Sequence, residues 1–213
     1  MGNIIARHKL FWSSKSAYSN IAVSILLLFI ALLFNYGANV YATSRADNSV
    51  TDIILDNLPV VDVSSVFVLG YAFLILFILI IILTEPQQTP FLIKSIALFI
   101  VVRAIFITLT HLSQPADSLS FNESTILKKL ASGDDLFFSG HTGIPFLLAL
   151  AYWKHSRLRA MFITGSLIFG FSVLLGHLHY SIDVFAAFFI TYGIFTIATK
   201  FFKKDYKLFL EKV

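Results

Sequence analysis

The stretch GDDLFFSGHT occupies residues 133–142, and the stretch HLHYSIDV occupies residues 177–184. Apolar runs lie between and around both, so groups able to act as acid, base or nucleophile adjoin hydrophobic segments. Ionisable side chains are costly inside a membrane and tend to mark functional sites there. The two stretches therefore mark where a site is expected.

The composition is that of a membrane protein. Hydrophobic residues make up 57% of the chain and charged residues 13%, with a mean hydropathy of +0.82, whereas soluble domains carry roughly 25% charged residues. We therefore predict an all-α integral membrane protein, with residues 1–213 as a single domain. The formal net charge of +4 would suit nucleic acid or anionic lipid. Because the basic residues adjoin apolar runs, we expect the lipid bilayer as partner and no nucleic acid.

Six apolar segments are candidates for membrane-spanning helices, each of which needs about 20 mostly apolar residues. The fourth segment is short and reaches that length only if residues 136–138 also lie at membrane depth. The first lacks a convincing cleavage site and is expected to be a retained signal anchor. We predict six transmembrane helices in one bundle, at roughly residues 20–36, 63–83, 90–110, 142–153, 159–176 and 182–202.

The basic residues orient these segments. Lysine and arginine precede the first segment, separate the fourth from the fifth and follow the sixth, while the alternate loops hold mainly acids. Basic loops face the cytoplasm, so both termini are predicted to be cytoplasmic. This orientation brings a set of polar side chains to one membrane face: Arg103, His111, His141, His177, His179 and Asp183.

His179 and Asp183 form the first candidate catalytic pair. They are four residues apart, so on a helix the carboxylate lies beneath the imidazole and accepts its ring N–H. If Ser181 instead caps the sixth helix, His179 stands just outside it and Asp183 still reaches back. Either geometry produces a nucleophilic histidine with an orienting acid.

The segment around His141 is a candidate phosphate site. Ser139 and Gly140 form a tight turn before a helix whose cap is predicted to be Thr142. The start of such a helix presents free backbone N–H groups to phosphate oxygens, and His141 stands where it could protonate a leaving oxygen.

Arg103 is the only arginine or lysine well inside a predicted span, and it requires an anion such as a phosphodiester or Asp135. His177, His179 and Asp183 are metal ligands by type, but two histidines two residues apart point differently on a helix. Cysteine is absent, which excludes thiolate metal sites. Arginine, histidines and helix ends can carry the charge of a phosphate, so no Mg²⁺ or Zn²⁺ is required, and we expect no metal and no other cofactor.

Both stretches resemble motifs of one enzyme family. GDDLFFSGHT resembles the third motif of sphingomyelin synthases and their ethanolamine- and inositol-phosphoceramide relatives, and HLHYSIDV resembles the fourth. Residues 103–112 are similar, more loosely, to their second, arginine-and-threonine motif. This sphingomyelin synthase-like branch belongs to the type 2 phosphatidic acid phosphatase superfamily. The resemblance covers roughly residues 90–200, expected to be the catalytic core, and the first two spans match only in hydropathy.

The resemblance implies a two-step, metal-independent transfer. His179, supported by Asp183, attacks the phosphorus of a phospholipid head group, a phosphohistidine forms and diacylglycerol leaves, with His141 handling the proton. A ceramide-like alcohol or water then takes the phospho-head group. Asp135 matches the acid before the family's Ser-Gly-His and is expected to orient His141. Further candidates for substrate contact are His111, His177 and Tyr180.

The chain also departs from related patterns. The family's cysteine before Gly-Asp is absent, and His111 and Ser113 stand where the family is richer in proline. The Lys-to-Arg-Pro motif of phosphatidate phosphatases and their Ser-Arg before the last histidine are missing, which favours the synthase-like branch. A short chain without an extra cytosolic domain is typical of bacteria. We therefore expect the bacterial inner membrane, with the site on the periplasmic face.

Two other function classes compete with this interpretation. One is a phosphatase of lipid phosphates or polyprenyl diphosphates, and the other is a proton-coupled transporter, for which buried histidines are also natural. Against a transporter, the polar groups gather at one membrane face rather than at the midplane, and no internal repeat is evident. The head group, the acceptor and the oligomeric state are left open by the sequence.

Overall fold

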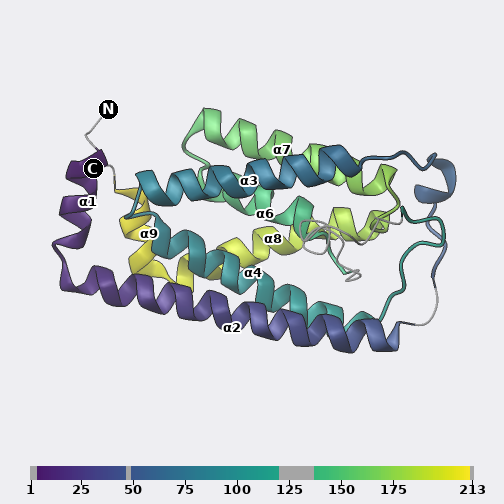
Figure 1. The fold of residues 1–213 in the computed structure, drawn as a ribbon, viewed down its shortest axis with the longest axis horizontal. Helices are drawn as coiled ribbons and strands as arrows, with labels where there is room; N and C mark the ends of the chain where they lie inside the picture. Colours follow the sequence, from purple (N-terminus) through teal and green to yellow (C-terminus); the bar gives the residue numbers. More distant parts are fainter. Residues whose placement is uncertain (1–3, 47–48, 120–136, 212–213) are drawn as a thin grey trace.

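The computed structural model describes residues 4–46, 49–119 and 137–211, and all regular structure in those parts of the chain is helical (Figure 1). This confirms the predicted all-α class. In chain order the helices are α1 (Ile4–Trp12), α2 (Lys15–Arg45), the 3₁₀ turn η1 (Leu55–Asn57), α3 (Ser64–Thr84), α4 (Thr89–Thr110), α6 (Gly140–Ala151), α7 (Ser156–Leu175), α8 (Ser181–Phe201) and α9 (Lys203–Leu210).

Five of these helices are long and apolar enough to cross a membrane: α2, α3, α4, α7 and α8. They correspond to five of the six predicted spans. The sixth, α6, is apolar but has 12 residues, about 18 Å of helix, so a sixth complete crossing stays a prediction. The first predicted span, residues 20–36, is too short, because α2 continues to Arg45 and has 31 residues.

α2 and α3 each pack against the rest of the bundle through side chains that recur every seven residues. α2 buries a small residue at every seventh position, Ala17, Ser24, Ala31 and Ala38, along its contact with α4. Small residues let membrane helices approach closely. α3 has the same seven-residue spacing, but its buried side chains are large and it packs beside α7. Most other side chains of both helices are exposed, as expected for helices that face lipid.

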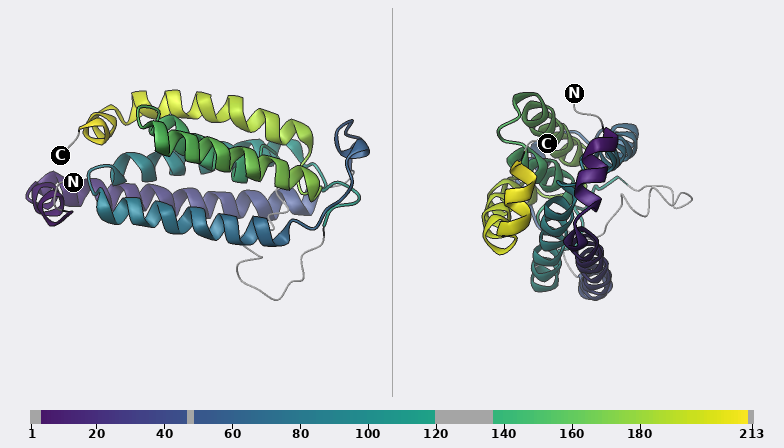
Figure 2. Two further views of the ribbon diagram at one scale, coloured as in Figure 1. Left: turned by 90° about the horizontal axis from the view of Figure 1, so that it is seen from above. Right: turned by 90° about the vertical axis from the view of Figure 1, so that its left-hand side faces the viewer.

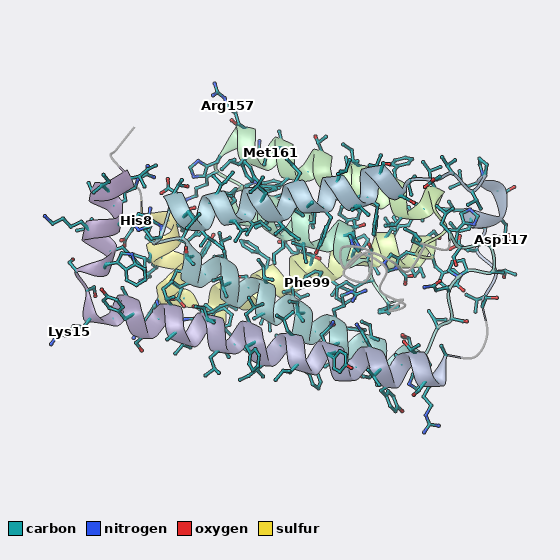
Figure 3. All side chains as sticks on the ribbon, in the orientation of Figure 1. His8, Lys15, Phe99, Asp117, Arg157 and Met161 are labelled. Atoms are coloured by element: carbon teal, nitrogen blue, oxygen red, sulfur yellow. The ribbon has the colours of Figure 1, made fainter. Side chains whose placement is uncertain are left out.

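α6 lies at the centre, in contact with α4, α7 and α8. Its start is set by two phenylalanines that precede it: the rings of Phe137 and Phe138 lie 5.4 and 5.9 Å from that of Phe106 in α4, and Phe138 is also 5.4 Å from Phe99. Phe99 lies near the middle of the bundle (Figure 3). Phe137 and Phe138 therefore pack against α4 inside the bundle. That residues 136–138 lie at membrane depth stays a prediction, and Leu136 lies outside the described residues.

The short helices α1 and α9 lie at the same end of the bundle in all views (Figures 1 and 2). We call it the terminal end, and the opposite end the site end. His8 and Lys15 lie at the terminal end and Asp117 at the site end (Figure 3). Basic and acidic loops are thus separated as the sequence predicted, while assignment of the terminal end to the cytoplasm stays a prediction.

A buried ion pair fastens α9 to the bundle at the terminal end. Lys94 of α4 donates to Asp205 of α9 at 2.7 Å and to Asn20 of α2 at 2.7 Å, and Asn20 donates to Asp205 at 2.6 Å. Lys94 is 7% exposed and Asp205 is 6% exposed. Arg103 is therefore not the only basic side chain buried in a long helix. Each polar atom of the Lys94 pair has a partner, which buried charges require.

Candidate active site

Three segments meet at the site end of the bundle: the second half of α4, the start of α6, and the connection from α7 to α8. The backbone N–H of Ser139 donates to the carbonyl of Asp183 at 3.0 Å, and Nε of Arg103 donates to the carbonyl of Phe138 at 3.0 Å. Two predicted motifs and the predicted arginine are thus joined directly. Arg103, Ser139 and Asp183 therefore belong to one connected cluster, while the shared membrane face inferred from the sequence stays a prediction.

His179 and Asp183 lie in contact. Nδ1 of His179 is 3.4 Å from Oδ2 of Asp183, and the side chains are 6% and 0% exposed. α8 begins at Ser181 with Tyr180 as its N-cap, so His179 precedes the helix and Asp183 reaches back to it. The same Oδ2 atom accepts the backbone N–H of Tyr180 at 3.0 Å. As in the second of the two expected geometries, His179 stands outside the helix, but the predicted cap at Ser181 is wrong, because Tyr180 is the N-cap and Ser181 is the first residue of α8.

The start of α6 corrects one prediction. The N-cap is Ser139, whose Oγ accepts the backbone N–H of Thr142 at 3.3 Å, and Thr142 is inside the helix rather than its cap. Ser139 has an extended backbone (φ −60°, ψ 117°), which lets its side chain fold back over the first turn. The helix therefore begins at Gly140, one residue before His141. N–H groups in the first turn have no acceptor within the helix.

Arg103 lies against this helix start. Its side chain is buried, and a Cβ atom added to Gly140 would lie 3.5 Å from Nε of Arg103. Such a Cβ would make only ordinary van der Waals contact, so the guanidinium lies beside the N-terminus of α6 without requiring glycine at this position. A guanidinium beside the N-terminus of a helix favours anions, and phosphate oxygens in particular.

His141 is held between aromatic rings of α3. Its ring centroid lies 4.1 Å from that of Phe67 and 4.6 Å from that of Tyr71. The sequence analysis missed both residues. They are four apart and share a helix face, but Phe73 and Phe77 have the same spacing, so the pattern alone did not single them out.

The other predicted residues lie at the rim of this cluster. His111 ends α4, and its ring lies 5.2 Å from that of Tyr41 in α2. His177 is buried, and its Nε2 lies 3.2 Å from the carbonyl of Leu58. Contact of either histidine with substrate stays a prediction. Asp135 lies outside the described residues.

Tyr180 is buried, with its hydroxyl in two hydrogen bonds. The hydroxyl donates to the carbonyl of Ser113 at 3.0 Å and accepts the N–H of Val50 at 3.1 Å. It thereby links the start of α8 to the α2–α3 loop and to the segment after α4. Its predicted contact with substrate is not tested by these bonds.

Backbone strain is concentrated around the site. Within the described residues, the non-glycine residues with positive φ are His111 (46°), Phe138 (32°) and His177 (50°). Such conformations cost about 1–3 kcal/mol each and persist only where the surroundings impose them. Phe138 directly precedes Ser139, and its carbonyl is the one that Arg103 holds. The turn into α6 is therefore fixed by the arginine as well as by ring packing.

Asp52, in the α2–α3 loop, is a further residue that the sequence analysis did not select. Its Oδ2 accepts the backbone N–H of Ser181 at 2.6 Å, and its Oδ1 accepts those of Ile54 and Leu55 at 2.9 and 3.2 Å. Burial alone would raise the pKa of Asp52, but hydrogen bonds from Ser181, Ile54 and Leu55 outweigh burial and lower the pKa below its ordinary value. In the sequence, Asp52 is one of several acids in this loop, and no local pattern distinguishes it from the others.

In the part of the chain that the structure describes, no three His, Cys, Asp or Glu side chains converge as a metal site would require. A cavity of about 250 Å³ lies at the terminal end, between α1, α2 and α9, and none of the predicted site residues lines it.

The apolar helices indicate a multi-pass membrane protein, and at one end of its bundle histidines lie near Asp183 and Arg103. Residues 133–200 match a family model described as PAP2 superfamily C-terminal. The match includes His141, His179 and Asp183, and supports the type 2 phosphatidic acid phosphatase superfamily, and with it lipid phosphatase or phosphotransferase activity. A search of curated proteins found no match. Arg103, His111 and Asp52 lie outside the matched residues.

Proposed function

We propose that this protein is a membrane lipid phosphotransferase or phosphodiesterase that works through a phosphohistidine on His179. The observation that carries the proposal is the contact of His179 Nδ1 with the Asp183 carboxylate, 3.4 Å away, in a cluster joined to Arg103 and the start of α6. A carboxylate at Nδ1 favours the tautomer with its proton there, which leaves Nε2 as the nucleophile and stabilises the imidazolium that forms.

In the first step, Nε2 of His179 attacks the phosphorus of a phospholipid head group. The bond from phosphorus to the diacylglycerol oxygen breaks, and that oxygen takes a proton from His141, so diacylglycerol leaves. Arg103 and the first N–H groups of α6 balance the charge on the phosphoryl oxygens. These groups can stabilise the transition state without a metal ion.

In the second step, the hydroxyl of an acceptor attacks the same phosphorus. His141, now neutral, accepts the hydroxyl proton, the nitrogen–phosphorus bond breaks, and the electron pair returns to His179. We propose a ceramide-like alcohol or water as acceptor, on the resemblance of both stretches to the sphingomyelin synthase-like branch. The proposed location is a bacterial inner membrane, with the site end on the periplasmic face.

The decisive experiment uses the purified full-length protein in liposomes. Phosphatidylcholine, phosphatidylethanolamine, phosphatidylglycerol and phosphatidic acid are supplied separately, with and without ceramide and with and without a chelator. Diacylglycerol and new phospholipids are followed by mass spectrometry. His179→Ala removes the proposed nucleophile, and His155→Ala, which changes an exposed histidine at the start of α7, is the matched control.

We expect diacylglycerol from at least one phosphodiester lipid, retained with chelator and in His155→Ala but lost in His179→Ala. Alkaline quenching during turnover should leave the phospho-head group on the peptide that contains His179. A new ceramide product would establish transfer over hydrolysis. Turnover of phosphatidic acid alone would assign the protein to the lipid phosphatases instead. No turnover of any lipid by folded protein would overturn the proposal and favour the transporter.

A further inference from the structure

The connection from α7 to α8, which carries His177 and His179, is held by two loops from elsewhere in the chain. These are the α2–α3 loop and the segment that follows α4. Of residues 175–181, all but Leu178 and His179 bond to one of these loops. The bonds are Val61 N–H to Leu175 O (2.8 Å), Leu119 N–H to Gly176 O (3.1 Å), His177 Nε2 with Leu58 O (3.2 Å), Tyr180 Oη–H to Ser113 O (3.0 Å), Val50 N–H to Tyr180 Oη (3.1 Å) and Ser181 N–H to Asp52 Oδ2 (2.6 Å).

Asp52 makes the shortest of these bonds and the only one to the first residue of α8. Its other oxygen is fixed by the N–H groups of Ile54 and Leu55, so the carboxylate is rigid before it reaches Ser181. A carboxylate at a helix N-terminus also interacts favourably with the helix dipole. The α2–α3 loop thus provides an anchored anion that fixes where α8 begins.

That starting point determines the geometry of the proposed nucleophile. His179 lies two residues before Ser181, and Asp183 lies two residues after it. If the first turn of α8 frays, the backbone between His179 and Asp183 is no longer fixed, and their 3.4 Å contact is lost. No other described residue accepts the N–H of Ser181.

We infer that Asp52 is a positioning residue for His179. By accepting the N–H of Ser181, Asp52 fixes the first turn of α8, so that the ring of His179 keeps its Nδ1 on Asp183 and its Nε2 toward the phosphorus. This inference rests on the proposed function. It also makes the α2–α3 loop part of the catalytic unit, although that loop lies outside both the matched residues 133–200 and the expected core at residues 90–200.

The two partners of this bond can be removed separately. Asp52→Ala removes the acceptor. Ser181→Pro removes only the donor N–H and the hydroxyl, because proline suits the first position of a helix and the extended backbone of Tyr180 (φ −69°, ψ 156°) is the one required before proline. Ser181→Ala keeps the N–H and controls for loss of the hydroxyl. Asp56→Ala removes an exposed acid of the same loop and is the matched control.

The first measurement is turnover of the lipid that the wild-type protein uses, with kcat and KM determined separately in liposomes. We expect Asp52→Ala and Ser181→Pro each to lower kcat by about tenfold, less than the roughly hundredfold that a 1 Å misplacement can cost, with KM changed less than about twofold. The double variant should be no slower than the slower single variant, because both changes break one bond. Asp56→Ala should match wild type, and Ser181→Ala should be faster than Ser181→Pro.

The second measurement does not depend on any activity. Protein labelled with ¹⁵N in the histidine rings is studied by NMR, with the His179 signals assigned from a His179→Gln variant. We expect wild-type His179 to show one ring tautomer, protonated at Nδ1, and Asp52→Ala and Ser181→Pro to show a mixture, while thermal unfolding confirms that both variants are folded.

Additive losses in the double variant, or a fall in kcat without a change in the His179 tautomer, would overturn the positioning role. An unchanged kcat in both single variants would do the same. If the wild-type protein turns over no lipid, the proposed function fails, and the NMR arm alone decides whether Asp52 orients His179.

Discussion

The backbone N–H of Ser139 donates to the backbone carbonyl of Asp183 at 3.0 Å. Ser139 caps α6 and Asp183 lies in the first turn of α8, so this one bond joins the starts of two helices far apart in the sequence. Because it uses backbone atoms, no side-chain pattern could have indicated it. It explains why the two histidine motifs occupy one cluster: the helix start that suits phosphate is fixed directly to the acid that contacts His179.

His141→Asn tests the proposed proton donor. If His141 protonates the diacylglycerol oxygen, the variant should lose about 10²–10⁴-fold in kcat on its natural phospholipid, the range for general acid catalysis. A substrate with a nitrophenol leaving group needs no proton from the enzyme. The same variant should therefore lose far less activity on a nitrophenyl ester of the same phospho-head group.

The measurement compares steady-state rates on both substrates for wild type, His141→Asn and His179→Ala. His179→Ala should lose activity on both, because the nucleophile is needed whatever the leaving group. An equal loss by His141→Asn on both substrates would show that His141 does not protonate the leaving oxygen.

Much of the fold was predictable because the bilayer imposes it. A hydrocarbon layer of about 30 Å requires long apolar helices, and five such segments form them. The spacing of His179 and Asp183 likewise predicted their contact. The helix cap at Ser139 was missed because Ser and Thr are both good caps, and the choice between Ser139 and Thr142 depends on where the chain enters the bundle.

Asp52 and Phe67 were missed for a different reason. Each reaches the site from a segment distant in sequence, through contacts that tertiary packing creates. Asp52 is one of several acids in its loop, and Phe67 is one of several phenylalanines in its helix. Neither has a local pattern that separates it from its neighbours.

Gly143→Ala tests the close packing of α6. A Cβ atom at this position would lie 2.6 Å from ring atoms of Phe99 and 2.9 Å from Oγ1 of Thr191, and Phe99 is fully buried against Phe138. Overpacking of this kind costs about 1–3 kcal/mol. The melting temperature in detergent should fall for this variant.

Gly165→Ala in α7 is the control, because its Cβ lies in open space. It should leave the melting temperature unchanged or raise it, since alanine is the better helix former. A similar melting temperature for both variants would contradict the packing described.

Lys94→Met tests the buried pair at the terminal end. It leaves the carboxylate of Asp205, which is 6% exposed, without its cation, and breaking such a pair costs about 3–5 kcal/mol. Thermal unfolding should therefore shift to clearly lower temperature.

The double variant Lys94→Met/Asp205→Leu should recover part of the lost stability, because no buried charge remains. Lys200→Met, at an exposed position of α8, is the control. If Lys94→Met unfolds no earlier than Lys200→Met, the pair does not stabilise the fold.

Acid should weaken the protein partly through Asp52. Its pKa in the folded protein lies below the ordinary value of 3.8, so the unfolded chain takes up the proton first as pH falls. The stabilisation from its charged form is therefore complete above pH 3.8 and is lost as the pH falls from 3.8 through the lowered pKa.

The variant Asp52→Asn removes this titratable group. Its melting temperature should lie below that of wild type by a constant amount from pH 7 down to about pH 4, and the difference should shrink at lower pH. Unfolding curves of both proteins between about pH 2.5 and 7 measure this difference, with Asp56→Asn as the control from the same loop. A difference that stays constant or widens below 3.8 would show that the charged form of Asp52 does not stabilise the folded state.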